Sequence, residues 1–488
     1  MTRRTFLSGT LAGSAVVGAG LLSGCGASGT SGSASSAAAS AVTGSPIPGA
    51  TATQISAAEL VPLQLFAWDG FNGEALFALG GASSQVSEPG EVMRIVQTIN
   101  AASGNPANPT TPAFDDYCAA FGSFGDQLAA LATSASAHPV TARTRFLRSS
   151  MYATQQLFFI LGSSQGSQEE AIFDKVETRW NEAVSRMKPA GVQFQVSSDF
   201  GQIPGYFFAP DSSGDKKPTV IISSGSDGQN VESMQFGVTA GLQRGYNVVL
   251  FEGPGQMTPL FKNSVPFTPD WDKVVGPVLE WTKARADVGK VGLIGVSFGG
   301  MLCARAAAKL PGLSAVVLEP AAWNFAGLWK DQADVAKVKS TVNLPPADKA
   351  KARAELNAGF LQVFPKLPRT VQFDIYKRGS ILTKQTQADA RAGKPVSDYY
   401  GLLEALLTFD YAADYAAITI PSMLTENQGD QFFLQQGAEA YAKLTNVPPA
   451  DKVLLPLTAP QGAQLHDQPN GPQVAQEYIF DWLDQYLR

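Results

Sequence analysis

The chain has 488 residues, of which 16% are charged and 44% are hydrophobic. This length leaves room for two or three compact units of about 150 residues, and the composition excludes a highly charged disordered chain. The 36 basic and 42 acidic residues give a net charge of −6 without any basic run, which excludes a nucleic-acid partner. Only two histidines occur, His138 and His466, so a three-histidine metal site cannot form within one chain, and we expect no metal and no other cofactor.

Residues 1–24 are predicted to be an export signal. Arg3 and Arg4 precede an apolar stretch that ends at Leu22, a pattern typical of twin-arginine signals, which are read by a receptor. Gly and Ser interrupt this stretch, which falls short of the ~20 apolar residues that cross a bilayer, so a transmembrane anchor is the weaker alternative. The tetrapeptide Leu-Ser-Gly-Cys resembles a bacterial lipobox. Its Cys25 is therefore a candidate lipid anchor at the outer face of the cytoplasmic membrane or in the periplasm.

The next segments differ in composition. Residues 25–53 are almost wholly Ser, Ala, Gly and Thr, which predicts a flexible tether outside the fold. Residues 54–190 show helix-like apolar spacing, so a mostly helical N-terminal region is expected. Cys118 and Cys303 are the remaining cysteines. Their spacing does not show whether they form a disulfide, and we expect both to be free and buried.

After Pro189, short β-rich runs alternate with helical stretches, which predicts a mostly parallel sheet covered by helices. Runs such as Val220-Ile221-Ile222 are continuously apolar, as in strands that are buried on both faces. Eight strands are predicted, at Val192–Ser197, Tyr206–Ala209, Thr219–Ser223, Asn247–Phe251, Lys290–Ile294, Ala315–Leu318, Ser422–Thr425 and Lys452–Leu455. Helices are predicted near Ser233–Arg244, Asp270–Lys283, Gly300–Leu310 and Gln473–Leu487.

Residues 322–417 interrupt this alternation with a long stretch of helical composition. We predict that they form a helical cap inserted after the sixth strand, which leaves residues 191–321 and 418–488 as the core. The cap segment is rich in aromatic residues, which line a substrate cavity or fill the cap's own core; they include Phe325, Trp329, Phe360, Phe364, Phe373 and Tyr376.

The motif G-x-S-x-G occurs twice, at residues 162–166 and 295–299. It places a nucleophilic serine on a sharp turn between a strand and a helix. Ser297 follows the strand-like Val291–Ile294 and precedes small residues that let a helix pack closely over the sheet, so it is the predicted nucleophile. Ser164 comes before any strand pattern, and we expect it to lie in a turn between helices.

The general base follows from chain order. On a nucleophile elbow of this kind the serine is followed by an acid and then by a histidine. His466 is the only histidine after Ser297, and it lies between the last predicted strand and the closing helix. His138, which precedes Pro139, is predicted to be structural or exposed.

The favoured acid is Asp430, in a turn just after the strand Ser422–Thr425. A carboxylate there can accept the imidazole N–H and stabilise the imidazolium. Glu426 and Glu319 remain alternatives, and Asp467, next to the histidine, is expected to point elsewhere.

When the serine attacks a carbonyl group, the carbonyl oxygen becomes negative, and it needs backbone N–H donors that are already in place. One is expected from Phe298 and the other from Gly225 or Ser226, in the loop after the third strand. An ordinary turn is the alternative for this loop.

Together these motifs resemble the α/β-hydrolase fold, in the branch of the fermentation-respiration switch-type esterases, the fungal yellowish-green pigment hydrolases that shorten polyketides, and the dihydroxypseudooxynicotine hydrolases. The resemblance covers roughly residues 150 to 488, and it implies an eight-stranded, mostly parallel sheet with a helical N-terminal region and a cap after strand 6. The residues that carry it are Ser224–Gly228, Phe251–Gln256, Gly295–Gly300, Gly429-Asp430 and Gly462–His466.

The resemblance implies a serine hydrolase that acts on a small-molecule ester or thioester and is held at the membrane through its N-terminal lipid. One alternative is hydrolysis of a C–C bond in a β-dicarbonyl, with an enolate as the leaving group. In the C–C-cleaving relatives, however, a functional glutamate occupies the second of the two positions that are Met257-Thr258 here. The other alternative is a non-catalytic binding protein on a hydrolase scaffold. The sequence does not predict the substrate's size or the oligomeric state.

Overall fold

The computed structural model describes residues 61, 63–433 and 436–488. The predicted signal (1–24), its Cys25, the tether (25–53) and the first residues of the predicted helical region lie outside the described residues. Within the described ranges, no helix combines the length and the apolar character needed to cross a bilayer.

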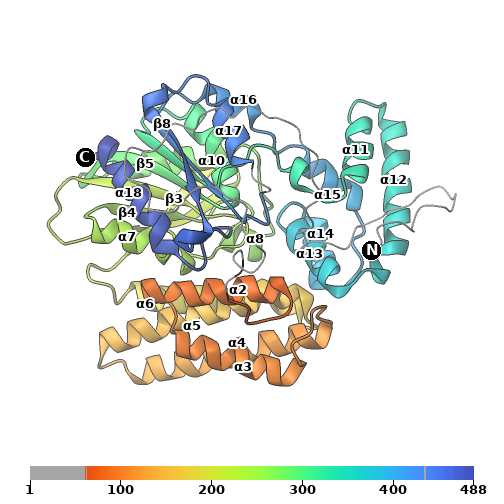
Figure 1. The fold of residues 1–488 in the computed structure, drawn as a ribbon, viewed down its shortest axis with the longest axis horizontal. Helices are drawn as coiled ribbons and strands as arrows, with labels where there is room; N and C mark the ends of the chain where they lie inside the picture. Colours follow the sequence, from red (N-terminus) through yellow and green to blue (C-terminus); the bar gives the residue numbers. More distant parts are fainter. Residues whose placement is uncertain (1–60, 62, 434–435) are drawn as a thin grey trace.

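Eight strands form one sheet in the order β1-β2-β4-β3-β5-β6-β7-β8 (Figure 1). β1 pairs antiparallel with β2, as does β2 with β4, whereas all other neighbours are parallel. The predicted α/β fold with a mostly parallel eight-stranded sheet is thereby confirmed. The strands are β1 (Val192–Ser198), β2 (Gly201–Phe208), β3 (Lys217–Ser223), β4 (Asn247–Phe251), β5 (Val288–Val296), β6 (Ala315–Glu319), β7 (Ser422–Asn427) and β8 (Lys452–Leu457).

The second strand begins five residues earlier than predicted. β1 and β2 form a hairpin in which Ser198 faces Gly201 and Val192 faces Phe207. The start of β2 is exposed and has no apolar residue before Ile203, so the hydrophobic pattern did not reveal it. Backbone pairing with β1, not burial, makes this segment a strand.

Helices cover both faces of the central strands. Gly292 and Gly295 lie three residues apart on β5 and therefore face opposite sides of the sheet. A Cβ on Gly292 would contact Leu487, whereas one on Gly295 would contact the start of the next helix. α18 therefore covers one face and α10 the other. The covering helices are α7 (Val238–Gln243), α9 (Trp271–Lys283), α10 (Phe298–Lys309), α17 (Gly437–Lys443) and α18 (Pro472–Leu487), and the short helix α8 (Met257–Phe261) follows β4.

The helix predicted from Ser233 to Arg244 is divided in two. A single 3-10 turn at Glu232–Met234 precedes Gly237, and α7 begins only at Val238. The φ angle of Gly237 is 143°, a conformation that glycine alone adopts readily and that interrupts a helix.

The N-terminal helices form a layer beneath the sheet in Figure 1. Their aromatic core holds Phe71, Phe114 and Phe159, and Phe373 from the cap packs into the same cluster. Each such ring contributes about 1.5–3 kcal/mol by its removal from water, so this cluster joins the N-terminal region firmly to the cap. The helices are α2 (Asp69–Gly80), α3 (Pro89–Ser103), α4 (Thr111–Ser134), α5 (Pro139–Phe159) and α6 (Glu169–Val184).

Six helices lie between β6 and β7 (Figure 1). Phe364 packs against both Phe360 and Tyr376 inside this group, whereas Phe325 and Trp329 line a cavity together with Ser297. The helices are α11 (Gln332–Thr341), α12 (Pro346–Val363), α13 (Arg369–Ser380), α14 (Lys384–Arg391), α15 (Tyr399–Leu406) and α16 (Ala412–Ala417). Cys118 on α4 and Cys303 on α10 are both free and buried.

The central strands should dominate stability. Leu293 on β5 is fully buried, so Leu293→Ala should lower the free energy of unfolding by about 2–5 kcal/mol through lost burial and a residual cavity. Chemical denaturation measures the change. Leu131→Ala is the matched control, because this side chain on α4 is 50% exposed and its loss should change the free energy by less than about 0.5 kcal/mol. Equal losses in the two variants would contradict the assignment of the core.

Candidate active site

Ser297 occupies a strained turn between β5 and α10. Its backbone has φ 55° and ψ −125°, a rare conformation for a residue with a side chain, and one typical of a nucleophile elbow. The turn is tight on both sides. A Cβ on Gly295 would lie 2.3 Å from the carbonyl oxygen of Gly299, and a Cβ on Gly299 would lie 2.5 Å from that of Ser223. Only glycine fits these two positions, which explains the G-x-S-x-G pattern physically.

Ser164, in the other G-x-S-x-G match, does not follow a strand. It is exposed in the segment between α5 and α6, where its N–H and its hydroxyl both donate to Asp115. It therefore lies in a turn between helices, as the sequence predicted.

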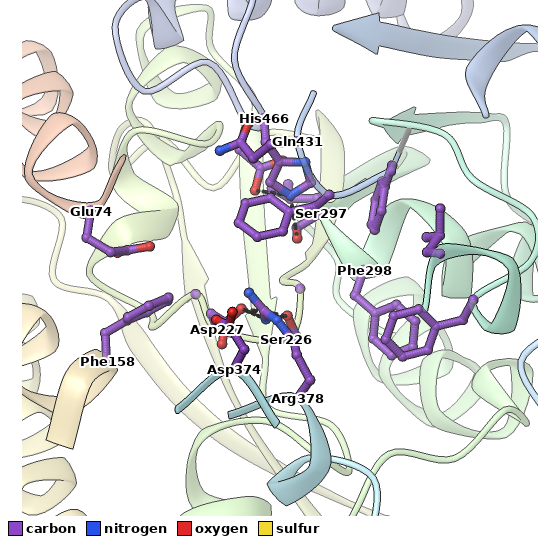
Figure 2. Close-up of a pocket in the computed structure, with 18 of the residues that line it drawn as sticks. Glu74, Phe158, Ser226, Asp227, Ser297, Phe298, Asp374, Arg378, Gln431 and His466 are labelled. Carbon is purple, nitrogen blue, oxygen red and sulfur yellow. Dashed lines mark hydrogen bonds and ion pairs between the residues drawn. The ribbon is translucent and has the colours of Figure 1, made fainter. Parts of the chain in front are cut away.

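Hydrogen bonds join Ser297 to His466 and Asp430. The Oγ of Ser297 lies 2.9 Å from Nε2 of His466, and Nδ1 of the same ring lies 2.8 Å from Oδ2 of Asp430. The other oxygen of Asp430 accepts the N–H groups of Phe432 and Phe433, at 2.8 and 2.7 Å. The carboxylate is thereby oriented by the backbone of its own loop. Figure 2 shows the imidazole directly over the serine.

The alternative residues make no side-chain hydrogen bond to the imidazole of His466. Neither carboxyl oxygen of Glu319 makes a hydrogen bond within the described structure, although the residue is buried behind the site. Glu426 makes no hydrogen bond to the imidazole, whose Nδ1 is engaged by Asp430. His138 is exposed at the start of α5.

Asp467 was expected to point away, and this expectation is wrong. Its Oδ2 lies 3.5 Å from Nε2 of His466, and the residue lines the cavity. The cause is local backbone geometry: Asp467 and Gln468 have φ angles of 53° and 48°, which turn the chain back so that two consecutive side chains face one site.

These carboxylates change the acidity of His466. The ring is buried, with Phe432 and Phe433 packed edge-on against it at 4.9 and 5.0 Å. Burial alone would lower the pKa, but the negative charges of Asp430 and Asp467 outweigh it and raise the pKa of His466 from 6.5 to about 9. Burial also raises the pKa of Asp467. The imidazole is therefore a stronger base than a free histidine.

The loop after β3 lies against the nucleophile. A Cβ on Gly225 would lie 2.8 Å from Ser297 Oγ and 3.0 Å from the backbone nitrogen of Phe298. Ser226 follows in the same loop and lines the cavity. The structure thus places Gly225 beside Ser297 and the backbone nitrogen of Phe298, and Ser226 in the wall of the same cavity.

Gln256 holds this loop, a role that sequence reasoning did not assign. Its Nε2 donates to the carbonyl oxygens of Ser224 and Gly225, at 2.5 and 3.1 Å, while its Oε1 accepts the N–H of Gly253 at 2.9 Å. The signal in the sequence is the run Gly253-Pro254-Gly255-Gln256, which is part of the family resemblance but does not by itself indicate which backbone groups the glutamine binds. Because both carbonyls are fixed, the peptide groups of the loop keep one orientation.

A cavity of about 170 Å³ connects these groups with the cap and with α2. Aromatic side chains form most of its wall, among them Phe158, Phe298, Phe325 and Trp329. Figure 2 shows Asp227, Asp374 and Arg378 on the side of the cavity away from His466, and Glu74 at the left of the view. Among the described residues, no group of three or more His, Cys, Asp and Glu side chains is arranged to hold a metal ion.

The carboxyl groups in this wall differ in how readily they lose a proton. Burial would raise the pKa of Asp227, but Arg378 and Lys377 hold it well below its ordinary value. Burial raises the pKa of Glu232 and of Asp374 to about 7. At neutral pH, Asp227 is thus the firmly ionised carboxylate of this group.

The elbow serine, the loop after β3 and the sheet order define an α/β-hydrolase. The model of the alpha/beta hydrolase family matches residues 220–463, half of the chain, and the chain belongs to this family. The expected resemblance to its branch of fungal hydrolases and dihydroxypseudooxynicotine hydrolases is confirmed.

The chain is similar to the alpha/beta hydrolase psoB of Aspergillus fumigatus, with 29% identity over 189 residues, or 36% of this chain and 42% of psoB. It is also similar to the hydrolase acrC of Aspergillus aculeatus, with 31% identity over 194 residues, or 35% of this chain and 44% of acrC. The chain thus spans less than half the length of these two relatives. The crystal structure of a 2,6-dihydroxy-pseudo-oxynicotine hydrolase shares the fold, with TM-score 0.55 and 17% identity over 84% of this chain and 95% of that one.

The proximity of Asp467 to His466 predicts a titration shift. Asp467→Asn removes a negative charge 3.5 Å from Nε2, so the imidazolium is less stabilised and the pKa of His466 should fall. NMR of histidine ring resonances across pH measures this directly, because the chain has only two histidines. The signals of the distant His138 should be the same in both proteins at each pH. An unchanged titration of His466 would show that the Asp467 carboxylate does not act on the ring.

Proposed function

We propose that this chain is a serine hydrolase with Ser297 as nucleophile, His466 as general base and Asp430 as the group that orients the base. The observation that carries the proposal is the continuous hydrogen-bond path from Ser297 Oγ through the imidazole to Asp430, at a strained elbow that faces a cavity. Membership of the alpha/beta hydrolase family supports hydrolysis as the reaction class.

The reaction begins when His466 accepts the proton of Ser297 as Oγ attacks the substrate carbonyl carbon. The new negative oxygen is stabilised by the N–H of Phe298 and by one from the Gly225-Ser226 loop, and each such donor contributes about 10²–10³ in rate. The imidazolium then protonates the leaving group, which leaves an acyl group on Ser297. Water, activated by the same imidazole, releases the acid.

An ester or a related acyl bond is the leading substrate class, because it needs nothing beyond these groups. The aromatic wall of the cavity favours an apolar acyl part. A β-dicarbonyl cleaved at a C–C bond is the second candidate, favoured by the cationic Arg378 in the same cavity. A non-catalytic binding protein is the remaining alternative, and it would not react with an active-site reagent.

Covalent labelling with a fluorophosphonate probe tests the nucleophile. Wild-type protein should be labelled at Ser297, and Ser297→Ala should abolish labelling because the attacking oxygen is absent. Ser164→Ala is the matched control. It changes the serine of the other G-x-S-x-G match, which is hydrogen-bonded to Asp115, and should label like wild type. Labelling that persists in Ser297→Ala would overturn the proposal.

We also propose that the chain is exported by the twin-arginine route and anchored through a lipid on Cys25. Arg3, Arg4 and the Leu-Ser-Gly-Cys run support this proposal. Such an anchor would hold the hydrolase at the outer face of the bacterial cytoplasmic membrane or in the periplasm, with residues 26–53 as the tether.

Membrane fractionation of a bacterial host that has the twin-arginine route tests the anchor. Cys25→Ser should move the protein from the membrane pellet to the soluble fraction and remove incorporation of labelled fatty acid, because the acylated thiol is lost. Ser28→Ala, a change of similar size three residues away, should keep both signals. Continued membrane association and fatty-acid labelling of Cys25→Ser would rule out lipid on this cysteine.

A further inference from the structure

Glu252 is a buried carboxylate in the turn that follows β4. The residue is 1% exposed and lies outside the wall of the cavity. Its Oε1 accepts a hydrogen bond from the side-chain amide of Asn230 at 2.6 Å, and its Oε2 accepts one from the backbone N–H of Thr258 at 3.1 Å. The carboxylate thus joins the end of the loop after β3 to the start of α8, and none of the reaction steps uses it.

The turn that carries Glu252 is rigid. The N–H of Glu252 donates to the carbonyl of Pro204 on β2 at 2.9 Å. Gln256 closes the turn on itself, because its N–H donates to the carbonyl of Gly253 at 3.0 Å and its Oε1 accepts the N–H of Gly253 at 2.9 Å. The side chains of Glu252 and Gln256 therefore start from positions that are fixed relative to each other.

These two side chains hold opposite ends of the loop after β3 (residues 224–231). Gln256 donates to the carbonyls of Ser224 and Gly225 at the start of the loop, whereas Glu252 binds Asn230 near its end. β3 and β4 are parallel neighbours, so the loop and the turn leave the sheet at the same edge. One turn thus fixes both ends of the loop that lies against the nucleophile.

The middle of the loop is held by its own residues and by the cap. The hydroxyl of Ser224 donates to the carbonyl of Gly228 at 3.1 Å. Arg378 on α13 donates to the hydroxyl of Ser226 at 3.1 Å and pairs with the carboxylate of Asp227 (Figure 2). The loop is therefore a compact hydrogen-bonded unit, and its peptide groups do not turn independently of its ends.

The ionised form of Glu252 suits this contact. Burial raises the pKa of the Glu252 carboxyl, whereas the hydrogen bonds from Thr258 and Asn230 lower it because they favour the charged form. A hydrogen bond to an ionised oxygen is shorter and roughly twice as strong as one between neutral groups. A carboxylate therefore fixes Asn230 more tightly than a neutral amide of the same shape does.

We propose that Glu252 is a positioning residue for the oxyanion site and acts through Asn230. Its carboxylate holds the far end of the loop and Gln256 holds the near end, so the N–H groups between them keep the direction that the negative oxygen needs. This inference rests on the proposed serine-hydrolase function. A donor stabilises the transition state only while it points at the oxyanion, and a misplacement of about 1 Å lowers a rate by about 100-fold.

Steady-state kinetics of the full chain with p-nitrophenyl butyrate test the proposal, together with inhibition by propyl trifluoromethyl ketone, whose serine adduct carries a negative oxygen. Glu252→Gln keeps the shape of the side chain but loses the ionised acceptor. Its kcat should fall about 10- to 100-fold, with KM changed by less than about threefold because the residue does not line the cavity. The inhibition constant should rise by the factor by which kcat/KM falls.

Asn230→Ala removes the other partner of the same hydrogen bond and should produce the same losses. The double variant of Glu252→Gln with Asn230→Ala should lose no more than about twofold beyond the larger single loss, because the two residues act through one contact.

Asp389→Asn is the matched control. Asp389 is a carboxylate of the cap that is 7% exposed and lies outside the cavity wall. It accepts the same kinds of donor as Glu252, the backbone N–H of Ser397 at 2.7 Å and the side-chain amide of Gln385 at 3.0 Å. Its variant should lower the melting temperature about as much as Glu252→Gln does, yet keep the kcat and the inhibition constant of the wild type.

A wild-type kcat in Glu252→Gln would overturn the positioning role. Losses that multiply in the double variant would also overturn it, because the effect would not pass through Asn230. Equal losses of kcat in Glu252→Gln and Asp389→Asn would do the same, since they would follow stability alone. Absence of both fluorophosphonate labelling and ester hydrolysis in the wild-type chain would instead remove the function on which the inference rests.

Discussion

The positive φ angle of Ser297 is the constraint on which the rest of the site depends. It lifts the side chain out of the strand at the point where β5 becomes α10. The turn can be this tight because Gly295 and Gly299, two residues away on either side, have no Cβ to clash with the backbone nearby. Two backbone hydrogen bonds hold the turn, from Ser297 N–H to the carbonyl of Glu319 at 2.7 Å and from Gly300 N–H to the carbonyl of Ser297 at 2.8 Å. The strain is thus maintained by the adjacent strand β6 and by the first turn of the helix.

The parallel sheet brings His466 and the other neighbours of this serine to the same place. β3, β5, β6, β7 and β8 are consecutive in the sheet and run in the same direction, so the loops that follow them meet at one edge. Ser297 and His466 are 169 positions apart in sequence and still within hydrogen-bond distance, because each follows the carboxyl end of a strand. Asp430 and the Gly225-Ser226 loop reach the same edge for the same reason.

Features governed by local pattern were predictable from the sequence. Buried parallel strands give continuous apolar runs, the elbow gives G-x-S-x-G, and two histidines leave one base after Ser297. The missed features depend on backbone conformation or on contacts between distant segments. The return of Asp467 to the site follows from a left-handed φ that its composition does not signal. The contact of Arg378 with Ser226 joins positions 152 apart and depends on how the cap packs.

That packing gives a structural role to the second G-x-S-x-G match. Arg369, at the start of α13, donates to the carbonyl oxygens of Gly162 and Leu161, and Phe373 on the same helix packs among Phe114 and Phe159. A Cβ on Gly162 would lie 2.2 Å from the Phe114 ring, so glycine is required there for close packing and not for a nucleophile. One end of α13 is thus fixed to the N-terminal helices, while Arg378 near its other end donates to Ser226 in the loop after β3. The N-terminal region therefore determines where the cap places its guanidinium, although that region contributes no residue to the hydrogen-bond path from Ser297 to Asp430.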